Sequence, residues 1–459
     1  MSVQKYVSFQ QLLDSLEQEK VKGSLRFLGE GITISKKEFA KKCFEKKSHF
    51  EEHGLISIGL FGGKSLELVS SFFGAALAGL RVVIIDPMED ASSIAKMAKY
   101  AELEKVLDID GQLEEDELKE INASLYSRKE GERESEGEGD ILFFTSGTSG
   151  PSKPVVLTSE SLLDACYNGQ SCLPAKEGDS VLSILPLSHV FGFVCSFLWP
   201  LCYDSSIVLG RGLKKMCEDV SASEATILTL IPTQVAFLLS RNCLNPESKT
   251  ILIGAGPLSE PLIAAIKAAG KSLAFGYGLT ETSSGVAISV GSDDPYAFSI
   301  CPEDEFRVEE DGTLSIKTPG LMKGYYKNEE ATKAAIDNGW LRTNDLGFID
   351  EEGKLHVIGR KDDILVLSSG MKMDAGKIES ALMLLTHGGD CALLVSDGAP
   401  MLVYFNIEQA LLNDVLKKMN ATLPLGTQIV ATRRLSSPLP RTRSGKVIRY
   451  KLMKMMEGM

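Results

Sequence analysis

The sequence predicts an α/β protein with a large N-terminal domain, built from parallel α/β sheets plus a small β-barrel-like part, and a small C-terminal α+β domain. Between residues 55 and 275, short apolar runs alternate with helical patterns, which is typical of parallel sheets with crossover helices. After residue 276 the pattern changes to hairpins. A chain of 459 residues is also longer than one hydrophobic core usually supports, so two or more domains are expected. We place the domains at residues 1–359 and 360–459.

The first half supplies the predicted sheets in order. LISIGLF (55–61) and RVVIID (81–86) are predicted strands, and the helical pattern SLELVSSFFGAALAGL (65–80) lies between them. SEPLIAAIKAAG (259–270) is a further predicted helix that also lies between two predicted strands. The charged segment 127–140 has no apolar residue and is predicted to be a linker or loop. Further buried strands are predicted at 180–185, 206–210, 225–230, 250–254 and 272–278.

The second half begins with two predicted hairpins. FRVEEDGTLSIKT (306–318) turns on Asp-Gly, and FIDEEGKLHVIG (348–359) turns on Glu-Gly. A short α+β segment follows. The chain ends in a tail, residues 433–454, that has eight basic residues and no acidic one.

Composition excludes several classes of protein. The chain has 49 basic and 62 acidic residues, and its net charge of -13 argues against a nucleic-acid protein. Residues 1–20 lack the pattern of a signal peptide. The most apolar stretch, 189–203, is too short to cross a bilayer, so no transmembrane segment is expected. Nine cysteines without a CxxC pair indicate free thiols, rather than disulfides or zinc ligands, in a cytoplasmic protein.

Two motifs suggest sites that the rest of the sequence does not support. GLFGGKS (59–65) follows a strand and precedes a helix, but only three residues separate its first glycine from Gly-Lys, and a P-loop needs four. HFEEH (49–53) fits an inverse zinc-protease pattern without an evident third ligand. We expect an ordinary turn at the first and a solvated helix face at the second.

One polar segment stands directly after a predicted buried strand. In TSGTSGPSK (145–153), the glycines let backbone N–H groups turn inward, the hydroxyl groups add donors, and the lysine adds a positive charge. This composition suits an anion-binding loop. A surface turn is the alternative when the loop is considered by itself.

Six further motifs occur with this loop, in a fixed order: LPLSHVFG (185–192), GAGPLS (254–259), GYGLTETS (276–283), WLRTNDLG (340–347), GRKDD (359–363) and PRTRSGKVIR (440–449). Together they resemble the AMP-forming acyl-adenylating superfamily of acyl-CoA synthetases, aryl-CoA ligases, luciferases and peptide-synthetase adenylation domains. The resemblance covers residues 55–451. It implies an acid–thiol ligase that uses ATP and Mg²⁺ to form an acyl-AMP, releases pyrophosphate, and transfers the acyl group to a thiol.

The resemblance also implies roles for individual residues. Glu281 would bind Mg²⁺ and Thr280 the α-phosphate, while Tyr277 would stack on adenine. The adenine would lie beside Gly254, Ala255 and Gly256 of the motif GAGPLS, and Gly278 would also contribute to the nucleotide site. The loop that would hold the β- and γ-phosphates consists of Thr145, Ser146, Gly147, Thr148, Ser149, Gly150 and Lys153.

Four residues complete the implied machinery. Asp345 would bind the ribose hydroxyls, and Arg360 would contact the same sugar. Lys446 would reach the reacting carboxylate, and Asp362 would be the hinge about which the small domain rotates between the two steps. Each residue also has an ordinary structural explanation: a core tyrosine, a helix cap, a turn aspartate or a solvated tail lysine.

Local composition indicates the kind of acid, and departures from the superfamily pattern bear on the acceptor. No acidic residue occurs between 180 and 203, which disfavours an amino acid, and the uncharged segment 190–203 favours an apolar acid, fatty or aromatic. His189 would gate the pocket or serve a structural role. CoA is the expected acceptor. Ala375 and Lys377 stand where members of the superfamily commonly have proline and glutamate. These replacements leave open a different acceptor, the phosphopantetheine of an acyl carrier protein. A luciferase-like oxygenase, or a non-catalytic nucleotide- or acyl-binding relic, would carry similar motifs.

Overall fold

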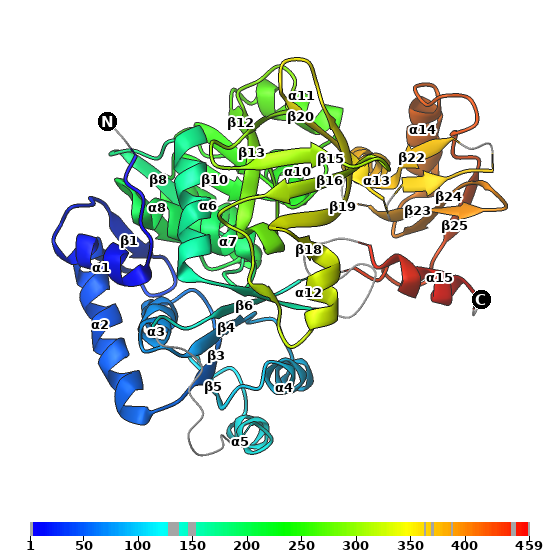
Figure 1. Ribbon diagram of the computed structural model, residues 1–459. Helices are drawn as coiled ribbons and strands as arrows, with labels where there is room; N and C mark the ends of the chain where they lie inside the picture. The colour runs from blue at the N-terminus through cyan, green and yellow to red at the C-terminus, as the bar shows by residue number, and fades with distance from the viewer. Residues whose placement is uncertain are drawn as a thin grey trace.

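The computed structural model has the predicted mixed α/β architecture (Figure 1). The structure describes residues 3–126, 137–145, 153–361, 364–368, 371–386, 389–441 and 447–457. Within these ranges most of the chain belongs to two large sheets and the helices that cover them, and a smaller lobe follows at the C-terminus.

The first sheet has six strands in the order β17-β7-β6-β4-β3-β5. The strands β3, β4, β5 and β6 run parallel, whereas β7 and β17 are antiparallel additions. Every residue of β3 and β4 is buried, as expected for parallel strands covered on both faces. The strands are β3 (Ser57–Phe61), β4 (Arg81–Ile85), β5 (Lys105–Asp108), β6 (Ile141–Phe144), β7 (Pro154–Leu157) and β17 (Gly324–Tyr325).

The second sheet has fourteen strands, and its centre is parallel. That part consists of β1 (Ser24–Phe27), β8 (Asp179–Ser183), β9 (Ser205–Leu209), β10 (Ile227–Leu230), β11 (Thr250–Ile253) and β12 (Ser272–Leu279). The antiparallel part, which includes both predicted hairpins, consists of β2 (Ile32–Ser35), β13 (Ser284–Val290), β14 (Ala297–Ile300), β15 (Glu305–Val308), β16 (Thr313–Lys317), β18 (Ile336–Asp337), β19 (Trp340–Ile349) and β20 (Leu355–Arg360).

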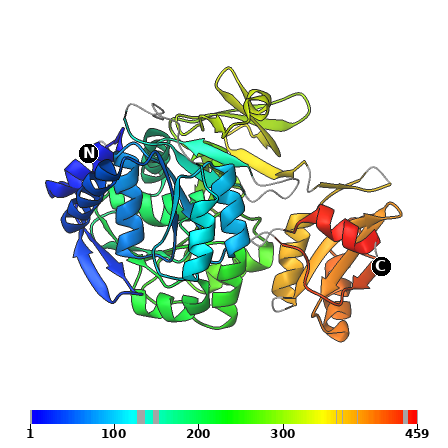
Figure 2. The same ribbon diagram turned by 90° about the horizontal axis from the view of Figure 1, so that it is seen from below.

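Helices fill the space between the sheets and cover their outer faces (Figure 2). The shared inner core contains α1 (Phe9–Glu17), α2 (Lys36–His53), α3 (Leu66–Leu77), α6 (Ser159–Cys172), α7 (Val190–Phe193), the π-helical turn η1 (Val194–Leu198) and α8 (Trp199–Cys202). The outer face of the six-stranded sheet packs on α4 (Ala91–Tyr100) and α5 (Glu115–Ala123). The large sheet packs on α9 (Met216–Ser223), α10 (Pro232–Ser240) and α11 (Glu260–Ala268), and α12 (Glu329–Ala335) lies near β17.

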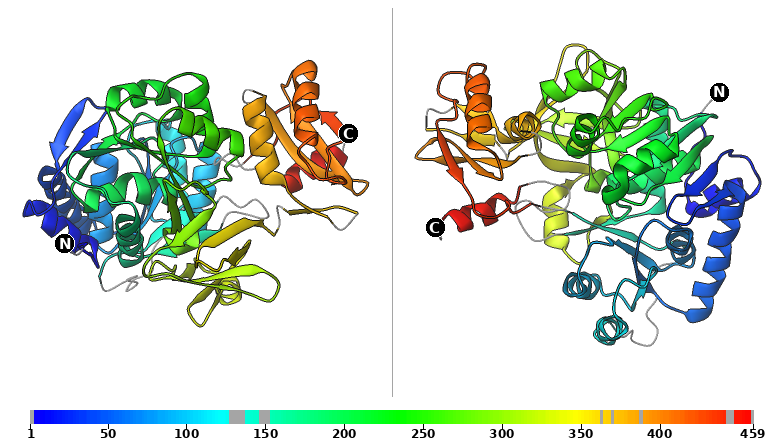
Figure 3. Two further views of the ribbon diagram at one scale, coloured as in Figure 1. Left: turned by 90° about the horizontal axis from the view of Figure 1, so that it is seen from above. Right: turned by 180° about the vertical axis from the view of Figure 1, so that it is seen from behind.

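The C-terminal lobe has its own small sheets and its own apolar clusters (Figure 3). β21 (Ile364–Val366) pairs with β22 (Lys372–Asp374), and β23 (Asp390–Ser396) pairs with β24 (Ala399–Phe405), which also pairs with β25 (Ala431–Arg434). The helices are α13 (Ala375–Leu385), α14 (Gln409–Asn420) and α15 (Arg449–Glu457). The predicted boundary after residue 359 falls one residue before the end of β20, and we retain it as a proposal.

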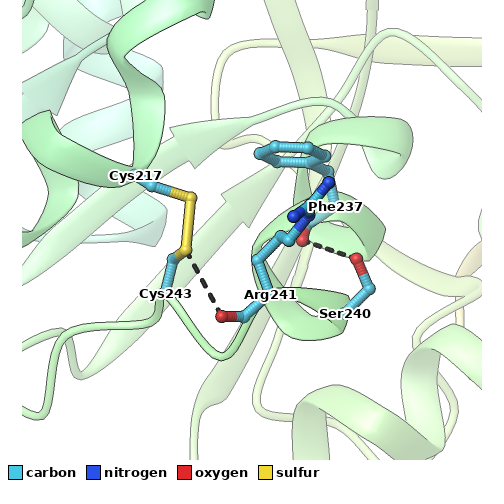
Figure 4. Close-up of a disulfide and its surroundings, with 5 residues drawn as sticks. All are labelled: Cys217, Phe237, Ser240, Arg241 and Cys243. Carbon is cyan, nitrogen blue, oxygen red and sulfur yellow. Dashed lines mark hydrogen bonds between the residues drawn. A yellow bond between two sulfur atoms is a disulfide. The ribbon is translucent and has the colours of Figure 1, made fainter.

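One expectation about the cysteines is wrong. Cys217 in α9 and Cys243 after α10 form a disulfide, with Cα atoms 5.3 Å apart (Figure 4). The two residues are 26 positions apart, and only the packing of α9 against the end of α10 brings them together, so their spacing gave no signal. The remaining seven cysteines are free thiols. The cysteines therefore give weaker support to a cytoplasmic location than the sequence suggested.

The structure places the first of the two unsupported motifs in a turn and the second at the end of a helix. Lys64 of GLFGGKS donates to the backbone oxygens of Ile184 and Leu185, at 2.7 and 3.2 Å, so the turn joins two parts of the core. Burial lowers the pKa of Lys64 to about 8. The helix with both histidines ends at Gly54, whose left-handed φ of 63° favours glycine. In the described part of the chain, no group of three or more metal-binding side chains occurs.

Candidate active site

A cavity of about 610 Å³ lies where the six-stranded sheet, the large sheet and α6 meet. Most of the motifs that were expected to form a site contribute to its wall. The lining includes Thr145, Lys153, His189, Gly254, Ala255, Tyr277, Gly278, Thr280, Glu281 and Arg360. The fold therefore brings together residues that are more than 200 positions apart in the sequence.

Both ends of the glycine-rich loop, Thr145 and Lys153, line this cavity. The loop connects the antiparallel strands β6 and β7, and its two flanking residues are joined by backbone and hydroxyl hydrogen bonds: Thr145 N to Lys153 O at 3.1 Å, and Lys153 N to Thr145 Oγ1 at 3.2 Å. A hairpin with closed ends thus presents Lys153 toward the site. The intervening predicted residues, Ser146, Gly147, Thr148, Ser149 and Gly150, lie outside the described residues.

Glu281 is held by a residue that the sequence did not reveal. The Tyr325 hydroxyl donates to Glu281 Oε1 at 2.9 Å, and the Lys153 ammonium lies 5.1 Å from the centre of the Tyr325 ring. Burial, and then the Glu281 carboxylate, raises the pKa of Tyr325. Tyr325 therefore connects Lys153 to the carboxylate that was expected to bind a metal.

The single carboxylate fits the requirements of Mg²⁺. This ion is commonly bound by one or two carboxylates together with substrate phosphates and water. Glu281 Oε2 has no hydrogen-bond partner among the described residues, and Lys153 lines the same cavity. The donor set therefore matches a metal that would arrive together with a nucleotide.

The backbone behind Glu281 is strained. Ser283 and Ser284 have φ values of 53° and 123°, a region that side-chain-bearing residues rarely occupy. Gly278 is required here, because a Cβ at this position would lie 1.8 Å from the Ser284 backbone oxygen. The tight turn fixes the direction in which Thr280 and Glu281 leave β12.

Tyr277, Asp345 and Arg360 form a linked group. The Tyr277 hydroxyl donates to Asp345 Oδ2 at 2.6 Å, and Arg360 Nε lies 3.4 Å from Asp345 Oδ1. Asp345 and Arg360 are directly opposite each other on β19 and β20. Burial, and then the neighbouring carboxylate, raises the pKa of Tyr277 well above its usual value.

This grouping changes what is expected of Asp345. Its side chain is almost fully buried, with 4% of the residue's surface exposed, and both of its oxygens have protein partners. A ribose would therefore share this carboxylate with Tyr277 and Arg360. The Tyr277 ring itself faces the cavity, as a residue that stacks on a base would.

The turn that begins at Gly254 lines the same cavity and directly follows β11, which pairs with β12, the strand that carries Tyr277. A Cβ at Gly254 would lie 2.8 Å from the Phe191 ring, so the missing side chain allows the ring to pack on the backbone. Ala255 has a left-handed φ of 62°, which is uncommon for alanine. His189 precedes α7 and lines the same wall, together with Phe191.

Two predicted residues with mechanistic roles, Asp362 and Lys446, lie outside the described residues. Lys377, one of the two replaced residues in α13, contacts the large part of the molecule. The Lys377 ammonium lies 4.9 Å from the centre of the Tyr296 ring, and the Tyr296 hydroxyl donates to Leu258 O at 2.8 Å. Lys377 thus forms a contact between α13 and the segment that precedes β14.

A family model for AMP-binding enzymes matches residues 17–326. The chain belongs to this family. The predicted resemblance is therefore confirmed, and the matched region contains every cavity motif up to Tyr325.

Curated relatives are 2-succinylbenzoate–CoA ligases from bacteria. The Bacillus velezensis protein is 32% identical over 262 residues, which cover 53% of each chain, so the alignment spans about half the length of this relative. The Bacillus subtilis protein is 28% identical over 384 residues, covering 77% of this chain and 75% of the relative.

Solved structures share the fold across nearly the whole chain. The anthranilate CoA ligase AuaEII in complex with anthranoyl-AMP has a TM-score of 0.85 at 18% identity, covering 99% of this chain and 98% of the other. O-succinylbenzoate coenzyme A synthetase (MenE) from Bacillus subtilis with ATP and magnesium has a TM-score of 0.80 at 23% identity, covering 96% and 98%. These likenesses confirm the predicted fold class.

Proposed function

We propose that this protein uses ATP to activate a carboxylic acid as an acyl-AMP, expels pyrophosphate, and transfers the acyl group to CoA. One observation carries the proposal: a single cavity joins the polar motif residues from β6 to β20 with an uncharged wall formed by α6 and residues 190–199. The polar part suits a nucleotide, and the uncharged part suits the body of an acid. Membership in the AMP-binding enzyme family supports the same activity.

Adenylation requires an anion to attack another anion, so the site must neutralise charge and align the reactants. In this proposal Lys153 and the loop from Thr145 hold the terminal phosphates. Glu281, oriented by Tyr325, holds Mg²⁺, which would withdraw charge from the phosphate oxygens when bound. Tyr277 and the turn Gly254–Gly256 enclose the adenine.

The remaining roles concern the sugar and the reacting atoms. Asp345 accepts from the ribose while Tyr277 and Arg360 keep the carboxylate oriented. Lys446 neutralises the reacting carboxylate, and rotation about Asp362 exchanges this lysine for another face of the small domain. The names of the curated relatives favour CoA over a carrier protein as the acceptor.

The cavity and the names of the relatives point to different acids. The names suggest 2-succinylbenzoate, an aromatic acid with two carboxylates. The uncharged wall of this cavity instead favours an acid with an apolar body, fatty or aromatic.

ATP–pyrophosphate exchange tests the activity directly. We expect exchange that depends on an added carboxylic acid, and AMP release that also requires CoA. If no acid in a broad panel supports exchange, the result would favour a nucleotide- or acyl-binding relic. Oxygen uptake or light emission would favour a luciferase-like oxygenase.

A further inference from the structure

The uncharged end of the cavity is built mainly by two neighbouring helical segments. α6 contributes Ala165 and Gly169, which are four residues apart and therefore share one helix face, and Leu173 follows directly after the last residue of the helix. The segment from η1 to α8 contributes Val194, Cys195 and Trp199. Among the described lining residues, the charged side chains other than histidine are Lys153, Glu281, Arg342 and Arg360. Lys153 directly precedes β7, Glu281 lies between β12 and β13, and the two arginines belong to β19 and β20.

Gly169 is unusual for its position. Glycine in a helix interior is destabilising relative to alanine, because it loses more conformational freedom on folding. The backbone at Gly169 does not have a positive φ, and a Cβ built there would meet no atom within 4 Å. Neither backbone conformation nor packing therefore requires glycine, and the visible consequence of the missing side chain is open space at the cavity wall.

Trp199 gives the same end of the cavity a fixed surface. Its residue is 3% exposed, and its Nε1 donates to Gln170 Oε1 at 2.8 Å. Gln170 is itself held by Ala175, donating to the backbone oxygen at 2.8 Å and accepting from the backbone N–H at 2.9 Å. The indole is thus anchored to α6 one residue beyond Gly169.

We propose that Gly169 is a specificity-determining residue: it leaves a recess, in a chamber whose indole wall is fixed, for the uncharged ring or branched end of a monocarboxylic acid. At the uncharged end of the cavity, an acid with a second carboxylate would have to bury that charge. The described residues of α6 and of the segment from η1 to α8 that line this end offer it no cationic partner, which is strongly unfavourable. This inference deepens the proposed function and rests on the cavity assigned there.

The test compares side chains introduced on the same helix. Gly169→Ala and Gly169→Leu place increasing volume in the recess, whereas Ser171→Leu places the same leucine at a position that does not line the cavity. Exchange kinetics are measured for benzoate, 4-butylbenzoate, octanoate and 2-succinylbenzoate. We expect Gly169→Leu to reduce kcat/KM for 4-butylbenzoate relative to benzoate by roughly tenfold or more, with Gly169→Ala intermediate. Ser171→Leu should keep the parental ranking.

A binding measurement separates this inference from the activity. The chain has two tryptophans, so a Trp340→Phe background leaves Trp199 as the fluorescent reporter. Titration with 4-butylbenzoate should change its emission, and Gly169→Leu should weaken that binding even if no exchange occurs. Gly169→Ala should melt no lower than the parent. An unchanged acid ranking or affinity in Gly169→Leu, a preference for 2-succinylbenzoate, or no emission change with any acid would overturn the proposal.

Discussion

Tyr277→Phe tests the link between the buried tyrosine–aspartate pair and nucleotide binding. The substitution keeps the ring that faces the cavity and removes the hydroxyl that donates to Asp345 Oδ2 at 2.6 Å. A hydrogen bond to a charged group contributes about 1.5–3 kcal/mol, and Asp345 is almost fully buried, so the loss falls in the upper part of this range. Arg360 still contacts the other carboxylate oxygen, so part of the orientation is retained.

The assay is the KM for ATP in pyrophosphate exchange, measured together with the urea unfolding midpoint. A loss of about 1.4 kcal/mol corresponds to a factor of ten. Because Arg360 retains part of the orientation, we expect about half of the hydrogen-bond energy to appear in ATP binding, so KM should rise by roughly tenfold and the midpoint should fall. Tyr296→Phe is the matched control. The Tyr296 hydroxyl donates to the Leu258 backbone oxygen at 2.8 Å, and Tyr296 does not line the cavity. A lower midpoint with an unchanged KM in Tyr277→Phe would refute the proposed role of the pair.

Four further outcomes are expected. Lys446→Ala should lose most acid-dependent exchange while retaining acyl transfer from a supplied acyl-AMP to CoA; equal loss of both steps would contradict the rotation of the small domain. Burial lowers the pKa of Lys36 from 10.5 to about 7, so the unfolded chain binds more protons between these values and stability should rise with pH from 7 to 9; Lys36→Met should flatten that slope. Cys243→Ser should cost roughly 3 kcal/mol of unfolding free energy under oxidising conditions, with no difference from the parent in dithiothreitol. Gly278→Ala should abolish exchange or folding, because its Cβ would overlap the Ser284 oxygen, and near-normal kinetics would show that the turn can relax.

Much of the fold could be predicted because the signals are local. Continuous apolar runs such as 81–86 become fully buried parallel strands, and both Gly-containing turns produce the predicted hairpins. Helix ends follow capping chemistry: Ser35 and Glu38 form a capping box, and Gly54 ends the same helix. The positions of the motifs at the ends of β6, β11 and β12 follow from the same alternation of strands and helices.

The missed features depend on long-range packing. Tyr325 belongs to a strand of two residues, too short to give an alternating pattern, and it meets Glu281 only because β17 pairs with β7. The disulfide and the contact between Lys377 and Tyr296 join segments that share no sequence pattern. The anchoring of Trp199 by Gln170 likewise requires α6 and α8 to pack in one register.

A crystal structure with ATP, Mg²⁺ and an unreactive analogue of an accepted acid tests the central claim most directly. The account predicts the adenine between Tyr277 and the turn Gly254–Gly256, the terminal phosphates beside Lys153, the metal on Glu281, and the acid body against α6. A nucleotide bound outside this cavity, or an acid bound in a compartment separate from the nucleotide, would contradict it.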